Sequence, residues 1–216
     1  MLTLDGLRVT IKGFVILRGV SLEVPPGGLV GLVGRNGAGK TTTLKSIMGL
    51  VPVVGGRLAL DGADLTAVPG HKRAKFGIGY MPEDRRLIGA LSVEDNVLMP
   101  AWATGRADDR TRLEYVYDLI PEVRQLAGRR AAQCSGGQQK MVALARAVMT
   151  GSKLLLLDEA FEGLSPALGE KFGRTIQALQ REGLAVLIAE SDTKRLGFVQ
   201  KIYTIERGEI VGAVLQ

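Results

Sequence analysis

The sequence predicts an α/β protein with a largely parallel core sheet, and two patterns carry that prediction. Short apolar runs that fit buried strands occur at 29–33, 154–157 and 184–189. Between them lie segments with apolar residues at helical spacing, as over 113–120. Strands that alternate with helices are typical of a parallel sheet covered by helices on its faces.

The first third of the chain is expected to form strands joined by tight turns. Partly alternating apolar residues predict strands over 3–9 and 17–24, and a further strand over 55–60. A helix is predicted over 41–50, because Gly49 stands near the end of a helical pattern.

From about 87 to 150 the pattern is helical, and this block is expected to be an insertion between core strands. The helix that covers 113–120 should stop at Pro121, and a second helix is expected over 141–148. Apolar residues over 168–179 predict one more helix. We therefore expect one domain, 1–216, in which 1–86 and 151–216 form the core and 87–150 forms a helical subdomain.

Composition excludes several classes of function. One Cys and one His among 216 residues leave no material for a disulfide framework, a Cys-rich metal site or a multi-His catalytic site. No apolar run approaches the roughly 20 residues of a membrane-spanning helix, and the N-terminus lacks a basic leader, so we expect a cytoplasmic chain. The net charge of +6 suits an anionic partner, although a solvated basic surface explains it as well.

The strongest motif is the glycine-rich segment 34–41, which follows a predicted strand and precedes a helix. Its glycines let successive N–H groups point at phosphate oxygens, and the helix adds the positive end of its dipole. Lys40 would reach the β- and γ-phosphates, and the Thr41 hydroxyl would bind Mg²⁺. The expected nucleotide-binding residues here are Gly34, Arg35, Asn36, Gly37, Ala38, Gly39, Lys40, Thr41 and Thr42.

A second motif is the apolar run 154–157 followed by Asp158 and Glu159. Taken alone, it is an ordinary end of a strand. Beside a phosphate loop, Asp158 would hold Mg²⁺ through its water shell, and Glu159 would orient or deprotonate the attacking water. Together the two motifs predict hydrolysis of ATP or GTP.

A third motif, Cys-Ser-Gly-Gly-Gln-Gln at 134–139, precedes an amphipathic helix. Ser135 can cap that helix, while the glycines permit close approach to a phosphate. With Lys40 and Asp158 on either side, the chain resembles the ATP-binding-cassette (ABC) ATPases, whose signature is LSGGQ. The resemblance covers essentially the whole chain. It implies a P-loop NTPase (RecA-like) core with an antiparallel β subdomain and a helical insertion, the ABC ATPase fold.

The resemblance also implies partners and cofactors. Such domains bind ATP and Mg²⁺ and pair head to tail, as homodimers or with a second, different ABC ATPase subunit. The signature residues that would act on the partner's ATP are Ser135, Gly136, Gly137 and Gln138. The helical insertion would face membrane-spanning permease subunits at the cytoplasmic face of the inner membrane. A solute-binding protein would be an indirect partner, and no nucleic acid is expected.

The finer resemblance is to the branched-chain amino acid importer type. It rests on the string GIGYMPEDRR at 77–86, on LSVEDNV at 91–97 and on GLSP at 163–166. Importers of urea or short amides are much alike, so the transported solute stays open at this point.

Among the departures from the general family pattern, those at Glu83 and Ser191 bear on catalysis. Glu83 stands where most members have Gln, a residue that touches Mg²⁺ or the attacking water. Ser191 stands where a switch His would hold the γ-phosphate, and Ser donates one hydrogen bond without carrying a charge. Full hydrolytic activity at this site is therefore in question. We expect Glu159, Glu83 and Ser191 to be catalytic, and Thr41, Asp158 and Glu83 to bind the metal.

The position of the aromatic residue that stacks on adenine maps to Lys12. Phe14, two residues later, is the candidate to replace it, and a place in the core would explain Phe14 equally well.

Two other functions compete with an importer subunit. A soluble ABC ATPase that acts on nucleic acid usually carries long coiled-coil insertions or two cassettes, and 216 residues leave no room for either. A regulatory subunit that binds ATP with weak hydrolysis is the other alternative; Glu159 argues against it, and Ser191 favours it.

Overall fold

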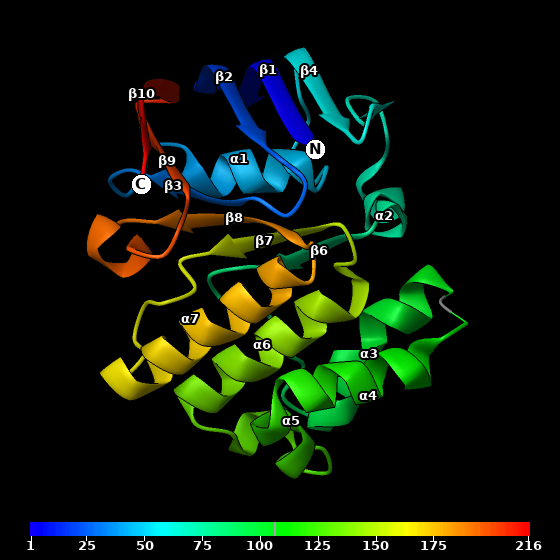
Figure 1. Ribbon diagram of the computed structural model, residues 1–216. Coiled ribbons are helices and arrows are strands. Elements are labelled where there is room, and N and C mark those ends of the chain that lie inside the picture. The colour runs from blue at the N-terminus through cyan, green and yellow to red at the C-terminus, as the bar shows by residue number, and fades with distance from the viewer. Residues whose placement is uncertain (106) are drawn as a thin grey trace.

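The computed structural model describes residues 1–105 and 107–216, and two β-sheets organise them (Figure 1). The first sheet is antiparallel, with the strand order β2-β1-β4-β5. Its strands are β1 (Leu2–Ile11), β2 (Phe14–Val24), β4 (Gly55–Leu60) and β5 (Ala63–Asp64). This is the antiparallel β part that the family resemblance implies.

The second sheet has the order β10-β9-β3-β8-β7-β6 and is parallel from β9 to β6. Within this second sheet, the edge strand β10 runs antiparallel to its neighbour β9. Every residue of β3, β7 and β8 is buried, which explains why these strands are continuous apolar runs. The strands are β3 (Leu29–Val33), β6 (Ile78–Met81), β7 (Leu154–Asp158), β8 (Ala185–Glu190), β9 (Lys201–Glu206) and β10 (Glu209–Leu215).

Helices separate and cover the sheets in layers (Figure 1). Helix α1 (Lys40–Ile47) lies between the two sheets, and one buried cluster joins it to both of them. Helices α6 (Gly136–Thr150) and α7 (Pro166–Arg181) cover the opposite face of the six-stranded sheet, in a second buried cluster. Helix α1, which follows the glycine-rich segment, is therefore held by apolar packing against a sheet on each side.

The remaining helices of the described chain are α2 (Gly70–Arg73), α3 (Val93–Thr104), α4 (Asp109–Leu119) and α5 (Pro121–Gln125). Helices α3, α4 and α5 pack against α6. Helix α6 itself contacts β6, and a Cβ atom on Gly79 would lie 2.1 Å from the carbonyl oxygen of Ala147. The expected boundary at residue 150 between a helical subdomain and the core stays a prediction. Helix α6 packs both on the other helices of that region and on the six-stranded sheet.

Three local expectations need correction. Helix α1 ends at Ile47 rather than at 50, since Gly49 has a φ of 66°. Pro121 does not merely stop a helix; it is the first residue of α5, a position that suits its fixed φ. Strands β9 and β10 were not predicted, and most side chains of β10 are exposed, so it lacks an alternating burial pattern.

A buried arginine closes the C-terminal end of α1. Arg73 is 3% exposed, and its guanidinium donates to the carbonyl oxygens of Ser46 and Ile47, the latter at 2.8 Å. Its Nε donates to the carbonyl oxygen of Val68 at 2.8 Å. The last carbonyls of a helix have no partner within the helix; the Ser46 carbonyl also accepts from the Gly49 N–H, and Arg73 supplies the donor for the Ile47 carbonyl.

We expect Arg73→Met to lower the free energy of unfolding by about 2 to 4 kcal/mol, because buried carbonyls lose their donors. Urea unfolding followed by circular dichroism measures this change. The exposed neighbour Lys72, changed to Met, is the control and should stay within about 0.5 kcal/mol of wild type. Equal losses in the two variants would contradict the capping role.

Candidate functional site: a phosphate loop facing buried carboxylates

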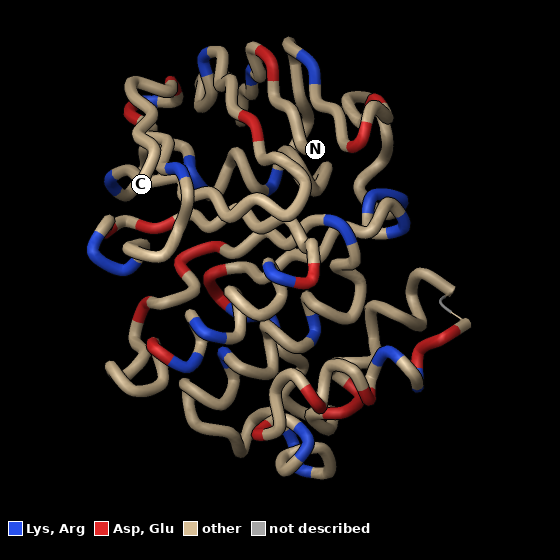
Figure 2. The backbone as a smooth tube through the Cα atoms, viewed as in Figure 1, with Lys and Arg blue, Asp and Glu red and all other residues tan. Residues whose placement is uncertain are grey.

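Acidic residues lie at or just after the carboxyl ends of three neighbouring parallel strands, β6, β7 and β8 (Figure 2). They are Glu83 and Asp84, then Asp158 and Glu159, and then Glu190. Ligands of open α/β sheets bind at this edge, outside the carboxyl ends of the strands. The loop after β3 reaches the same edge, so the glycine-rich segment and the acidic residues face one another.

The glycine-rich loop takes a conformation that side chains would block. Gly39, the residue before α1, has a φ of 116°, which is unfavourable for other residues. A Cβ atom on Gly34 would lie 2.3 Å from the carbonyl oxygen of Ile205, a distance that no real side chain tolerates. The loop therefore wraps closely before α1, and the N-terminus of that helix points into the site.

Lys40 places a buried cation at the floor of the site. The residue is 5% exposed, and its Nζ donates to the carbonyl oxygen of Gly34 at 2.7 Å. The same Nζ lies 3.1 Å from Ser191 Oγ and 3.1 Å from Glu159 Oε1. The Lys40 ammonium group thus contacts the glycine-rich loop and the residues that follow β7 and β8.

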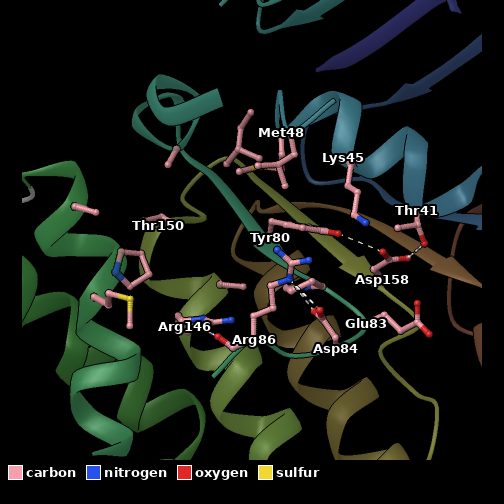
Figure 3. Close-up of a pocket in the computed structure, with 18 residues that line it drawn as sticks. Thr41, Lys45, Met48, Tyr80, Glu83, Asp84, Arg86, Arg146, Thr150 and Asp158 are labelled. Atoms are coloured by element: carbon pink, nitrogen blue, oxygen red, sulfur yellow. Dashed lines mark hydrogen bonds and ion pairs between the residues drawn. The ribbon is translucent and has the colours of Figure 1, made fainter. Parts of the chain in front are cut away.

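Asp158 is fixed by two hydroxyl groups. Thr41 Oγ1 donates to Asp158 Oδ1 at 3.0 Å, and the Tyr80 hydroxyl donates to Oδ2 at 3.2 Å (Figure 3). Burial raises the pKa of Asp158 to about 6, although both hydrogen bonds work in the opposite direction. Tyr80 is a site residue that the sequence analysis missed.

The Thr41 hydroxyl and the Asp158 carboxylate suit Mg²⁺, which prefers oxygen ligands. No group of three or more His, Cys, Asp or Glu side chains in the described part of the chain could hold a metal. Mg²⁺ commonly takes one or two protein ligands and completes its coordination shell with phosphate oxygens and water. Glu83 is exposed beside Thr41, and its metal contact stays a prediction.

Glu159 and Ser191 form the closest polar pair of the site. Ser191 Oγ lies 2.6 Å from Glu159 Oε1 and 2.9 Å from Asn36 Oδ1, and the Ser191 N–H donates to Glu159 Oε2 at 3.2 Å. Burial works to raise the pKa of Glu159, but hydrogen bonds from Ser191 and Lys40 outweigh it and hold that pKa below its ordinary value. Glu159 is therefore ionised at neutral pH.

Lys40, Thr41, Glu159 and Ser191 line a cleft of about 580 Å³, whereas Asp158 lines a neighbouring groove that Thr41 also borders. The residues that line the cleft are Ile16, Asn36, Gly37, Gly39, Lys40, Thr41, Thr42, Glu83, Glu159, Glu162, Glu190, Ser191, Asp192 and Arg195. Gly34, Arg35 and Ala38 border a second hollow, of about 600 Å³, which shares Asn36, Gly37 and Ser191 with the cleft.

The adenine contact is less well matched by the structure. Phe14 is 74% exposed, so the alternative of a core position is wrong. Nor does Phe14 line the cleft; Ile16, two residues along β2, does. The β1–β2 register shifts between Val9 and Thr10, which leaves Ile16 as the extra residue of a β-bulge, so strand alternation does not place Phe14 on the face of Ile16. Stacking of Phe14 on adenine stays a prediction.

The signature segment lies at the N-terminus of α6. Gln138 N donates to Ser135 Oγ at 3.3 Å, and Ser135 N donates to Gln138 Oε1 at 2.9 Å, which completes a capping box. A Cβ atom on Gly137 would lie 2.5 Å from Leu168 Cδ2. None of residues 134–138 is among the described residues that line the cleft, so any role on a nucleotide in trans stays a prediction.

Glu190 was also missed, because a single acid in an apolar run gives no motif. It is 1% exposed, and the Phe161 N–H donates to its Oε1 at 2.9 Å. Burial raises the pKa of Glu190 to about 7, and the charge of Glu159 pushes it the same way. The charge of Arg195 acts in the opposite direction and lowers the pKa of Glu190. The charge of Glu190 in turn acts to raise the pKa of Lys140.

Because its pKa is raised in the folded chain, Glu190 lowers the free energy of unfolding at neutral and alkaline pH. The folded chain holds the proton up to about pH 7, whereas the unfolded chain loses it near the ordinary value of 4.5. The free energy of unfolding therefore falls as the pH rises from 4.5 to 7. We expect Glu190→Gln, which stays neutral, to be more stable than wild type at pH 8 by about 1 to 3 kcal/mol.

Urea unfolding at pH 5 and pH 8, without added nucleotide, measures the effect, and the gain should be largely absent at pH 5. Glu162→Gln is the control, since Glu162 lines the same cleft but is exposed. An equal gain at both pH values would contradict a protonated Glu190.

Comparison with known proteins agrees with this geometry. The family model described as ABC transporter matches residues 17–162. The chain is 34% identical over 212 residues to the high-affinity branched-chain amino acid transport ATP-binding protein BraG of Pseudomonas aeruginosa, covering 98% of this chain and 91% of BraG. It is also 34% identical to the lipopolysaccharide export system ATP-binding protein LptB of Escherichia coli K12, covering 97% of this chain and 88% of LptB.

Solved structures show the same fold. A dimeric post-hydrolysis state of an ATP-binding cassette with ADP and phosphate superposes with a TM-score of 0.90 at 25% identity, covering 100% of this chain and 98% of that one. In the described residues, no helix has the length and apolar character needed to cross a bilayer. A phosphate loop facing buried carboxylates, the family match and these relatives lead to one conclusion: the chain belongs to the ABC transporter family, as an ATP-hydrolysing cassette.

Proposed function

We propose that this cassette is the energy-coupling ATPase subunit of an importer for branched-chain amino acids or a similar small polar solute, such as urea or a short amide. The observation that carries the hydrolytic part is the arrangement around Glu159. Its carboxylate lies 3.1 Å from the P-loop ammonium of Lys40 and 2.6 Å from the Ser191 hydroxyl, beside the Thr41–Asp158 pair.

The residues have distinct roles in this proposal. The P-loop N–H groups and Lys40 bind the phosphates of ATP and neutralise the charge that develops on the γ-phosphoryl group. Thr41 and Asp158 hold Mg²⁺, which supplies further neutralisation of the phosphate oxygens. Glu159, ionised and oriented by Ser191, accepts a proton from the attacking water.

Ser191 sets the expected rate at this site. A His at this position could carry a charge to the γ-phosphate, whereas the Ser191 hydroxyl offers a single proton, which its 2.6 Å contact directs at Glu159. We therefore propose that Ser191 positions the base and contributes little to phosphate binding. In a pair with a second, different cassette, the two ATP sites would then be unequal.

A groove beside the nucleotide cleft supports a permease partner. It measures about 550 Å³ and lies among α1, the loop after β6, α3 and α6 (Figure 3). Apolar side chains such as Met48 and Met99 line it together with basic groups, among them Lys45, Arg86 and Arg146. We propose that a segment of a membrane-spanning subunit binds there, at the cytoplasmic face of the inner membrane.

The solute is proposed from the relatives and the motif strings. BraG and the lipopolysaccharide exporter LptB are equally identical to this chain, so identity alone does not separate import from export. A branched-chain amino acid transport protein, LivF of Archaeoglobus fulgidus, is 32% identical over 212 residues, covering 97% of this chain and 90% of LivF. The importer-like string at 77–86 favours the amino acid.

We expect Glu159→Gln to bind ATP and to hydrolyse it at least about a hundredfold more slowly, because water activation is lost while phosphate binding remains. The variant should accumulate as an ATP-bound dimer, which light scattering measures. Lys40→Ala is the control and should neither bind ATP tightly nor dimerise. Hydrolysis by Glu159→Gln at the wild-type rate would show that Glu159 is not the base.

The solute is tested on the complete transporter, in liposomes that contain this cassette, its permease subunits and its solute-binding protein. We expect leucine, isoleucine or valine bound to that protein to raise ATP hydrolysis several-fold above the rate without solute. Urea, a short amide and lipopolysaccharide are the comparison substrates. Stimulation by lipopolysaccharide and by none of the small solutes would overturn the importer assignment.

A further inference from the structure

A buried lysine joins the signature helix to the catalytic segment of the same chain. Lys140 lies in the second turn of α6 and is 7% exposed. Its Nζ donates to the carbonyl oxygen of Glu159 at 2.9 Å and to that of Ala160 at 3.2 Å. Neither the P-loop nor the signature pattern required a lysine at this position, so the sequence motifs did not assign it a role.

The backbone that Lys140 holds is strained. Glu159 has a φ of 46°, in the left-handed region that residues with a side chain seldom adopt. Such a conformation is unfavourable for a residue with a side chain and persists only where surrounding contacts enforce it. The Glu159 N–H donates to the carbonyl oxygen of Ala189 at 2.9 Å, and the next anchor is the Phe161 N–H on Glu190. The contact from Lys140 fixes the carbonyl side of the same turn.

We propose that Lys140 is a positioning residue for ATP hydrolysis: by binding the carbonyls of Glu159 and Ala160, it fixes the catalytic carboxylate to the helix that begins with the signature. The inference rests on the proposed role of Glu159 as the base. Its consequence is that the orientation of the base in one site depends on the placement of α6, whose N-terminus would serve the partner's site.

The chemistry of the contact argues for more than packing. Burying an ammonium group is costly, and an apolar side chain of similar length would fill the space at less cost. Burial lowers the pKa of Lys140, while the charge of Glu190 partly opposes that shift. The ammonium group donates hydrogen bonds to two carbonyl oxygens at the end of a strained turn, which an apolar side chain cannot do.

Lys140→Met removes the donor while keeping a long side chain. We expect kcat to fall about ten- to a hundredfold with KM for ATP little changed, because a small misplacement of a catalytic group has effects of this size. Arg112→Met is the matched control, since Arg112 also donates to backbone carbonyls, those of Val148 and Gly151, far from Glu159. It should lose stability without losing kcat.

Two measurements separate positioning from general destabilisation. In a Glu159→Gln background, Lys140→Met should add no further loss, because both changes act through one carboxylate. Hydrogen–deuterium exchange should be faster over residues 159–161 in Lys140→Met and unchanged there in Arg112→Met. Lys140→Gln, which keeps an amide donor, should lose less of both activity and protection than Lys140→Met.

Wild-type kcat in Lys140→Met, an additive loss in the double variant, or unchanged exchange over 159–161 would each overturn the proposal. The exchange measurement does not depend on turnover. If wild type failed to hydrolyse ATP, the proposed function would fall, and exchange would still show whether Lys140 holds the Glu159 turn.

Discussion

The site depends on one desolvated interaction, the contact of the Lys40 ammonium with the acidic ends of the core strands. Asp158, Glu159 and Glu190 stand at the ends of adjacent strands, and each is buried or nearly so. Three carboxyl groups at one sheet edge repel one another unless a cation or a proton compensates. Lys40 compensates Glu159 directly at 3.1 Å, and the Arg195 guanidinium lies 3.8 Å from the Glu190 carboxylate.

That balance explains why an ATPase keeps features that weaken its fold. The buried acid at 190 and the left-handed backbone at 159 both cost free energy, and both residues line the cleft that holds Lys40. Functional sites commonly retain such strain, and the rest of the structure compensates for it. Here the compensation comes from the apolar layers on either side of the six-stranded sheet and from the closed end of α1.

The fold and the centre of the site were predictable because their signals are contiguous in the chain. The P-loop, the run that ends in Asp158 and Glu159, and the apolar strands each occupy a few consecutive residues with a fixed chemical meaning. Tyr80, Lys140 and Glu190 carry no such local signal. They join the site only because strand order brings β6, β7 and β8 side by side with α6 packed below, and a single sequence does not state that order.

Thr41 and Glu83 border both the nucleotide cleft and the neighbouring groove. Two ligands that contact the same side chains are thermodynamically linked when one ligand changes the positions that the other one needs. Linkage is reciprocal: a molecule in the groove that strengthens nucleotide binding must itself be bound more tightly by the same factor when nucleotide is present. Through these two shared residues, ATP binding could raise the affinity of the groove for a second molecule, and that molecule would raise the affinity for ATP by the same factor.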